Sequence, residues 1–453
     1  MGNLLVSLRN AAGAMRVFER GMAVVQGNVT NVSTPGYAKQ RQILQSMRFD
    51  LEVGLPGGVA SGGTLDSRSE FAEAGVRRSL GFLGEAEERA QHLQGLEPVF
   101  ALDENSGLSR AMNRMFQAFS ALAVAPNDSA GRRVALDRAG DLARSFRAVS
   151  QGVAEGLRSA ERGVVEQVER INGLVGQVVE VNRQFQSDFR AQGDAGLQAR
   201  MNDLLEQLSE VADFTVLRQE DGTATLYLGG QTLLAIGARQ YELKADTSGQ
   251  QAMVLDAGGL DVAGQVSRGR LHAVVGLRNE VIPAHQAELD GLAAALADRV
   301  NTLLGGGVDM SGQPPVQALF RYDAALGAAR TLEVNDLAPA ELALASPASP
   351  GGNAVALELA GLSQEKTAGG VTFSEYFGNI AAALGRQVAG AQETAGTHRQ
   401  LAAQARQLRE DAQKVNLDEE AIALIEFQRS YQASARLVQT LNEMTDTVLN
   451  MLR

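Results

Sequence analysis

Residues 142–185 read LARSFRAVSQGVAEGLRSAERGVVEQVERINGLVGQVVEVNRQF. Apolar residues recur in this stretch at steps of three and four, which is the seam of a long amphipathic helix. The seam consists of Leu142, Phe146, Val149, Val153, Leu157, Ala160, Val164, Val168, Ile171, Leu174, Val178, Val181 and Phe185. At roughly 1.5 Å per residue this helix is about 65 Å long, which predicts an elongated, mainly α-helical bundle.

Both ends of the chain carry the same kind of seam. The first runs through Leu4, Leu8, Ala11, Met15, Phe18, Met22, Val25, Val29 and Val32, and the last through Leu424, Phe427, Tyr431, Ser434, Val438, Leu441, Thr445, Val448 and Leu452. Residues 1–50 hold six basic and two acidic side chains, a net +4, whereas residues 410–453 hold four and eight, a net −4. We therefore expect the terminal helices to pair antiparallel, with Phe18, Met22 and Val25 facing residues 427–441 of the same chain or an equivalent stripe of a neighbouring copy.

Local signals set the limits of these end helices. Pro35-Gly36 fits the centre of a type II turn after the first helix. Asn416 fits the N-cap of the last helix, and Glu419 would complete a capping box. Gly13, Gly21 and Gly27 each weaken the first helix by roughly 1 kcal/mol relative to Ala. We therefore expect both ends to be mobile in the free subunit and ordered on assembly.

The remaining segments complete the predicted organisation. Shorter helices are expected at 77–95, 106–124, 196–212, 268–304 and 374–412, and a small antiparallel β region around Asp221-Gly222. The predicted strands are 214–219, 223–228, 232–236, 241–244 and 253–255. The predicted parts are a terminal coiled-coil domain (1–34 and 416–453), an extended connector (35–75), a helical rod domain (76–213 and 268–415), a β region (214–267) and an irregular segment (305–370).

Composition and motifs exclude several functional classes. The 453 residues carry a net charge of −12 and contain no Cys, so we expect no nucleic-acid binding, no disulfide and no thiolate metal site. No run of about 18 apolar residues could span a membrane, and no signal-peptide core begins the chain. The histidines, expected at the surface, lack metal-ligand spacing, and no nucleophile or phosphate-binding motif occurs. We expect no catalytic residue, no metal and no cofactor.

Two motifs point to a family. Residues 28–37, NVTNVSTPGY, resemble the N-terminal signature of flagellar axial proteins, and residues 415–420, VNLDEE, with 426–433, EFQRSYQA, resemble its C-terminal counterpart. Residues 96–100, 115–119, 203–209 and 309–313, together with Leu289-Asp290, Val300-Asn301 and Leu319-Phe320, resemble the first hook-associated protein family. The motif residues are Asn28, Asn31, Thr34, Pro35, Gly36, Tyr37, Asn416, Leu417, Asp418, Glu419 and Glu420.

The resemblance implies a structural, non-enzymatic subunit at the junction between hook and filament. Such a subunit leaves the cell by the flagellar type III pathway without a cleaved signal and assembles as a ring outside it. The implied partners are other copies of the chain, the hook protein, the third hook-associated protein and an export chaperone. The expected assembly interface comprises Leu4, Leu8, Met15, Phe18, Met22, Val25, Val29, Leu424, Phe427, Tyr431, Val438, Leu441 and Val448.

Two departures from the family pattern stand out. Lys414 replaces a Gly expected before the C-terminal motif, and the segment after Phe320 is too short for the outer domain of many relatives, so that domain is reduced or absent. Three alternatives stay open: a rod or hook subunit, a soluble helical adaptor or chaperone, and, least favoured, an enzyme.

Overall fold

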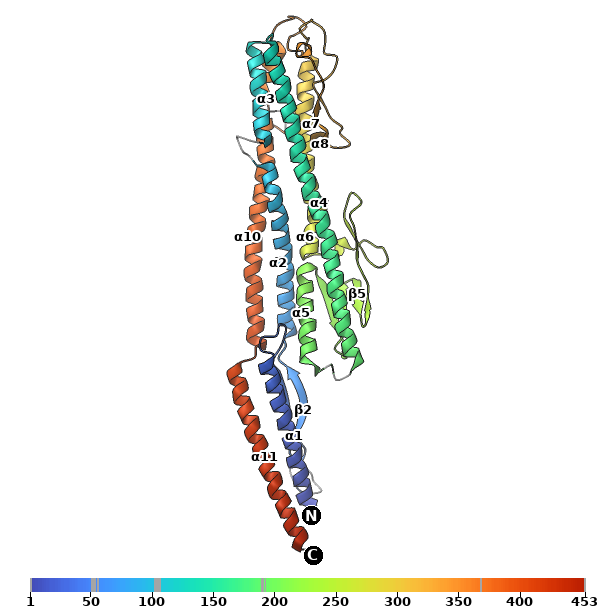
Figure 1. The fold of residues 1–453 in the computed structure, drawn as a ribbon, viewed down its shortest axis with the longest axis vertical. Coiled ribbons are helices and arrows are strands. Elements are labelled where there is room, and N and C mark those ends of the chain that lie inside the picture. Colours follow the sequence, from blue (N-terminus) through green and yellow to red (C-terminus); the bar gives the residue numbers. More distant parts are fainter. Residues whose placement is uncertain are drawn as a thin grey trace. The chain divides into compact units, whose positions relative to one another are not determined.

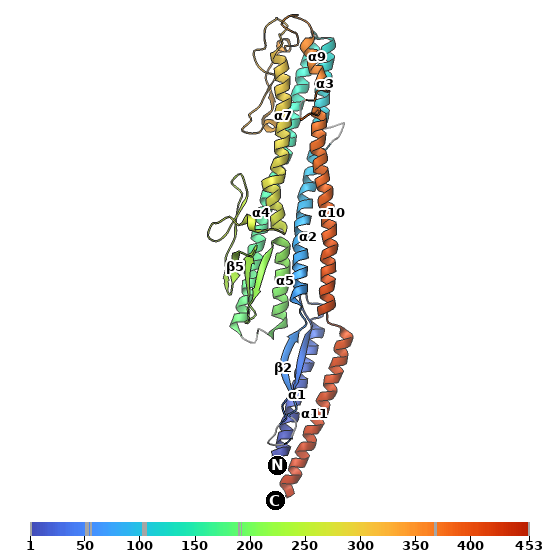
Figure 2. The same cartoon turned by 180° about the vertical axis from the view of Figure 1, so that it is seen from behind.

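The computed structural model describes residues 2–49, 54, 57–101, 107–188, 191, 193–366 and 369–451. The chain forms two compact units. One, here called the terminal unit, contains Met1–Leu83, Arg170–Glu242 and His398–Arg453; the other, the bundle unit, contains Gly84–Glu169 and Leu243–Thr397. Helices α2 (Glu70–Leu96), α4 (Ser129–Ser187) and α10 (Phe373–Gln413) contribute residues to both. Figure 1 and Figure 2 show the ribbon from opposite sides.

The two terminal helices lie side by side in the terminal unit. Helices α1 (Gly2–Thr30) and α11 (Leu417–Met451) run in opposite directions, so the start of α1 lies beside the end of α11 (Figure 1). The rings of Phe18 and Phe427 are 6.5 Å apart between centroids. The predicted antiparallel pairing is confirmed.

The connector is more ordered than its composition predicts. Strands β1 (Gln40–Ser46) and β2 (Val59–Asp66) form an antiparallel hairpin that contacts α1, and α2 already begins at Glu70. The expectation of an extended segment over 35–75 and of a helix starting at 77 therefore differs from the structure. Polar strand residues and two adjacent glycines in β2 hide the period-two pattern that marks a strand in the sequence.

The rest of the terminal unit combines helix and sheet. Helix α5 (Ala195–Val211) precedes β3 (Phe214–Arg218), β4 (Ala224–Leu228), β5 (Thr232–Ile236) and β6 (Arg239–Gln240), which pair in that order as an antiparallel sheet. The predicted hairpin at Asp221-Gly222 is confirmed, and Gly222 has φ +86°. Buried Asn182 on α4 donates to the carbonyls of Ala224 and Gly237, which ties the sheet to that helix.

The bundle unit holds the main apolar core. Core residues come from α2, α3 (Gly107–Val124), α4, α7 (Ile282–Gly305), α9 (Ala354–Gly361) and α10. The long helix predicted over 142–185 is confirmed, and Asp128 caps it earlier by accepting from the amides of Ala130 and Gly131. The predicted β region is divided, because β7 (Lys244–Asp246) and β8 (Met253–Leu255) form a separate hairpin in this unit.

The single helix predicted over 268–304 is interrupted. Helix α6 (Arg270–Gly276) passes into a π turn at Leu277–Val281, where the amide of Ile282 donates to the carbonyl of Leu277, and then into α7. Pro283 follows directly and has no N–H for the ordinary helical bond, so the local change of register has a steric and hydrogen-bonding cause.

The segment 305–370 is irregular but contributes to the core. Its short elements are β9 (Phe320–Arg321), α8 (Ala328–Thr331), β10 (Glu333–Val334) and α9. Phe320, Leu344 and Leu359 are buried in the bundle core. Buried Arg132 on α4 donates to the carbonyls of Pro339 and Leu342. The segment therefore packs on the bundle, and Arg132 bonds two of its carbonyls in addition to the segment's own backbone bonds.

Candidate functional site: where the two motifs meet

The N- and C-terminal motifs form one hydrogen-bonded site in the terminal unit. Asn28 is 1% exposed, and its amide nitrogen donates to Glu420 Oε2 and to the Gln40 carbonyl, each at 2.9 Å. Its oxygen accepts from the Tyr37 hydroxyl at 3.0 Å and from the Gln40 amide at 2.9 Å. All four groups are held by one buried amide, so we call this set the motif clamp.

Lys39 adds charge to the motif clamp. Its ammonium lies 2.7 Å from Glu419 Oε2 and 3.0 Å from Glu420 Oε1. Burial acts to lower the pKa of Lys39, but the hydrogen bonds to Glu419 and Glu420 outweigh it and hold the pKa above its usual value. Burial, and then the charge of Glu420, raise the pKa of Tyr37. The clamp therefore keeps Lys39 charged and Tyr37 neutral.

The turn of the N-terminal motif explains its glycine. The Tyr37 amide donates to the Thr34 carbonyl at 3.2 Å, and Gly36 has φ +72°, as expected for the third position of a type II turn. A Cβ on Gly36 would lie 2.5 Å from the Ala199 carbonyl oxygen. Asn31 accepts from the Thr34 hydroxyl and donates to the Gly27 carbonyl, which closes the end of α1. Position 36 therefore needs glycine for two independent reasons.

Of the two hydrogen bonds predicted to cap the helix of the C-terminal motif, one is present. Asn416 Oδ1 accepts from the Asp418 amide at 3.0 Å, which confirms the N-cap. The expected capping box is wrong in its second half, because the Glu419 carboxylate binds Lys39 instead of turning back to its own helix. The ion pair between Glu419 and Lys39 takes the place of the local bond to the backbone of α11.

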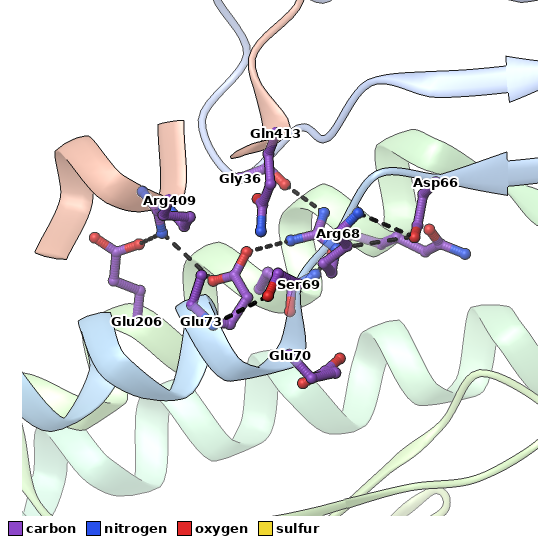
Figure 3. Close-up of polar contacts among 12 residues, drawn as sticks. Gly36, Asp66, Arg68, Ser69, Glu70, Glu73, Glu206, Arg409 and Gln413 are labelled. Atoms are coloured by element: carbon purple, nitrogen blue, oxygen red, sulfur yellow. Dashed lines mark hydrogen bonds and ion pairs between the residues drawn. The ribbon is translucent and has the colours of Figure 1, made fainter. Parts of the chain in front are cut away.

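A second polar cluster, here called the junction network, lies beside the motif clamp and consists of Arg68, Glu73, Glu206 and Arg409 (Figure 3). Arg68 donates 2.7 Å bonds to the Gly36 carbonyl and to Glu73 Oε1. Glu73 Oε2 then accepts from Arg409, which also binds Glu206 on α5. The side chains of Arg68 and Glu73 are 7% and 4% exposed.

Sequence reasoning missed the junction network. Members that bond to each other lie up to 336 positions apart, as Glu73 and Arg409 do, and no local spacing connects them. A weak signal existed: α10 places Arg406 and Arg409 on one face near its end, where only solvated charges would be expected.

The predicted interface residues lie on α1 and α11, which contact each other. Those that are buried or half-buried are Leu4, Leu8, Met15, Phe18, Met22, Val25, Leu424, Phe427, Tyr431, Val438, Leu441 and Val448. Val29 is 42% exposed, and Leu452 lies outside the described residues. Val17 and Gly21 are buried instead, so the seam on α1 is rotated from the predicted stripe. Helix α1 contacts β1 and β2 as well as α11, so both the hairpin and the other end of the chain bury its side chains.

The remaining features considered in the sequence are the histidines, metal-binding groups and membrane-spanning helices. His285, expected at the surface, is buried against Phe100 and lies 3.3 Å from Gln387 Oε1. Within the described residues, no group of three or more His, Asp or Glu side chains is arranged to hold a metal ion. None of the helices described there combines the length and apolarity that a bilayer span requires.

Comparison with known proteins identifies the family. Residues 93–320 match the model described as the flagellar hook-associated protein FlgK helical domain, and residues 412–451 match the flagellar basal body rod FlgEFG protein C-terminal model. Flagellar hook-associated protein 1 of Bacillus subtilis (strain 168) is 24% identical over 99% of both chains. That of Salmonella typhimurium is 23% identical over 67% of this chain and 57% of its own length.

A solved structure agrees with the fold. The flagellar hook junction protein FlgK from Burkholderia pseudomallei superposes with a TM-score of 0.66 at 14% identity, covering 74% of this chain and 99% of that one. The helical-domain match accounts for 93–320 of 453 residues, which is half of the sequence. This chain is a member of the flagellar hook-associated protein FlgK family.

Proposed function

We propose that this chain is a structural, non-enzymatic subunit of the bacterial flagellum that self-assembles into the junction between hook and filament. One observation carries the assembly role: the terminal helix pair leaves apolar side chains uncovered on α11. Ile422, Ile425, Leu437 and Met444 are about half exposed or more. Uncovered apolar positions along one helix are typical of an interaction surface.

The structure suggests two different roles for the two sides of α11. Residues of the seam, such as Phe427 and Leu441, hold α11 to α1 within the chain. Residues turned away from the seam, such as Ile425 and Leu437, are available to neighbouring copies. The interface residues predicted from the sequence are therefore proposed to act by forming the helix pair, and the uncovered residues by contacting other subunits.

The partners follow from the family. The proposed neighbours are further copies of this chain in a ring, the hook protein on one side and the third hook-associated protein on the other. Export by the flagellar type III pathway, an export chaperone and an extracellular site of assembly are likewise proposed. The names of the relatives, which are hook-associated, support the neighbouring hook.

A deletion strain tests this function. Cells lacking the chain should make hooks without attached filaments and release flagellin into the medium, and a plasmid copy should restore filaments. Shortened hooks or missing rods would instead indicate a hook or rod subunit. Normal flagella in the deletion strain would end the proposal.

Variants in that strain test the uncovered face. Leu437→Asp places a charge where an apolar contact is proposed, so it should be exported normally and fail to restore filaments. Gln432→Asp is the matched control, because Gln432 is exposed on the same helix and is already polar. If both variants restore filaments equally, the uncovered face is not an assembly contact.

A further inference from the structure

The motif clamp makes α1, the hairpin and α11 into one body. Asn28 joins α1 to both Gln40 of the hairpin and Glu420 of α11. Lys39 adds ion pairs from the hairpin to α11. We call α1, β1, β2 and α11 the end body.

The end body is joined to the rest of the terminal unit by polar groups. Only residues 414–416 separate α10 from α11. The Lys39 amide donates to the Gln413 carbonyl at 3.0 Å, and the Ser67 amide donates to the Lys39 carbonyl at 2.8 Å. Arg68 then binds the Gly36 carbonyl with one nitrogen and Glu73 with another.

From Glu73 the junction network continues through α10 to α5. Arg409 contacts Glu73 Oε2 at 3.4 Å and also binds Glu206 (Figure 3). The side-chain nitrogen of Gln413 donates to Glu73 Oε1, and its side-chain oxygen accepts from the backbone N–H of Ser69, each at 3.1 Å. Three helices are thereby tied to the turn of the N-terminal motif.

Apolar packing at the joint is small in scale: among residues 31–39 and 414–416 the buried apolar side chains are Ala38 and Val415. Two hollows of about 280 Å³ and 780 Å³ are lined by residues of the joint, and Val32, Lys414 and Val415 border both. An apolar cluster of this unit contains Val76, Leu80 and Ala402, further along α2 and α10. The joint is therefore bordered by open hollows and crossed by directional polar contacts.

We propose that the junction network sets the orientation of the end body relative to α2, α5 and α10 within the terminal unit. Planar guanidinium groups bind carboxylates in few geometries, so a chain of such pairs specifies one arrangement. Buried ion pairs add little net stability compared with well-packed apolar residues, so their contribution here is to orientation. The use of that orientation in assembly rests on the function proposed above, but the orientation itself is measurable in the free chain.

The natural absence of Cys allows a direct measurement. Spin labels at Gln432→Cys on α11 and Arg200→Cys on α5, both exposed, report the orientation by pulsed electron double resonance. Gln432 lies 15 residues beyond Leu417, about 22 Å along the helix, so a 10° swing of α11 moves the label by about 4 Å. A second pair at Ala23→Cys and Gln432→Cys lies within the end body and serves as the reference.

The decisive variant replaces the first ion pair by apolar residues. Arg68→Met with Glu73→Met should retain the thermal transition while broadening the α11–α5 distance distribution by several ångströms, and the reference distribution should stay narrow. The matched control is Arg158→Met with Glu155→Met, an ion pair whose side chains are 56% and 58% exposed. It should change neither distribution.

A second variant is needed in case the protein with both methionine substitutions does not fold. Arg68→Lys keeps the charge but has no second nitrogen to bind the Gly36 carbonyl while the first binds Glu73, so it should broaden the α11–α5 distribution to a smaller degree. An unchanged distribution in a folded junction variant overturns the proposal. So does a wild-type α11–α5 distribution that is already as broad as that of the variant. Neither result depends on whether the deletion strain loses its filaments.

Discussion

Gly21 is the position at which the pairing of the terminal helices can be tested by one methyl group. A Cβ on Gly21 would lie 2.8 Å from Cε1 and Cζ of Phe427 and 3.0 Å from Cδ1. Gly13 and Gly27 lie on the same helix, and a Cβ on either meets nothing within 4 Å. The three Gly→Ala substitutions therefore change helix propensity equally but packing at only one site.

The magnitudes separate the two effects. Gly→Ala in a helix interior stabilises the helix by about 1 kcal/mol, so Gly13→Ala and Gly27→Ala should each stabilise the pair by up to that amount. Gly21→Ala gains the same helix propensity but forces the Phe427 ring away, and overpacking of this kind costs about 1–3 kcal/mol. Gly21→Ala should therefore be about 1–3 kcal/mol less stable than either control.

Hydrogen exchange in α1 and α11 measures that difference. An offset of about 1–3 kcal/mol corresponds to a roughly 5- to 150-fold faster exchange than in the control variants. Exchange in α4 should be unchanged in all three. If Gly21→Ala protects α1 as strongly as Gly13→Ala does, then Phe427 does not pack on α1 in solution.

Four further predictions address the ends of the chain. Exchange in the wild-type free subunit should be faster before about residue 33 and after about 416 than in α4, and equal protection of a verified monomer would contradict the expected mobility. Leu441 is 9% exposed in the seam, so Leu441→Asp should destabilise the pairing of α1 and α11 by several kcal/mol. The variant should keep the thermal transition of the bundle unit but fail to join hook and filament, and normal export with full filaments would contradict this. Asn28→Ala leaves Glu420 and the Gln40 amide without their buried partner, which costs roughly 1–3 kcal/mol per group. Amide hydrogens of α1 and α11 should therefore exchange together, and faster than in the exposed control Thr30→Ala. The raised pKa of Tyr37 contributes stability that is present below its usual pKa of 10.0 and lost as pH rises through the higher folded value. The alkaline loss of helix in α1 and α11, followed by circular dichroism, should therefore be smaller in Tyr37→Phe, and an equal loss in both proteins would contradict this.

Local periodicity accounts for what could be predicted from the sequence. The three-four spacing over 142–185 describes α4 because each step concerns residues one turn apart. The turn at Pro35-Gly36 and the cap at Asn416 depend on the dihedrals and hydrogen bonds of three or four consecutive residues. The stripe on α11 likewise matched the side that α1 covers, so the pairing of the ends followed from the chain alone.

The stripe on α1 shows where this reasoning ends. The predicted line of large apolar residues includes Val29, which is exposed, whereas the buried side contains Gly21 and Asn28. A glycine is buried there because an aromatic ring from α11 occupies its place, and an asparagine because four groups converge on it. Neither reason is visible in hydrophobicity.

The same limit applies to the joint and to the segment 305–370. Arg68, Glu73, Glu206 and Arg409 are unremarkable charged residues in the sequence, and folding removes them from most of the water and brings them together as partners. Arg132 similarly organises an irregular segment by meeting carbonyls more than 200 positions away. The sequence by itself determined most of the helices, the turn at Pro35-Gly36 and the cap at Asn416, because those depend on neighbours along the chain. It also indicated the pairing of the ends, through the apolar seam that each end carries. The tertiary structure alone decided which polar groups are buried together, because burial and charge pairing depend on residues that only folding brings into contact.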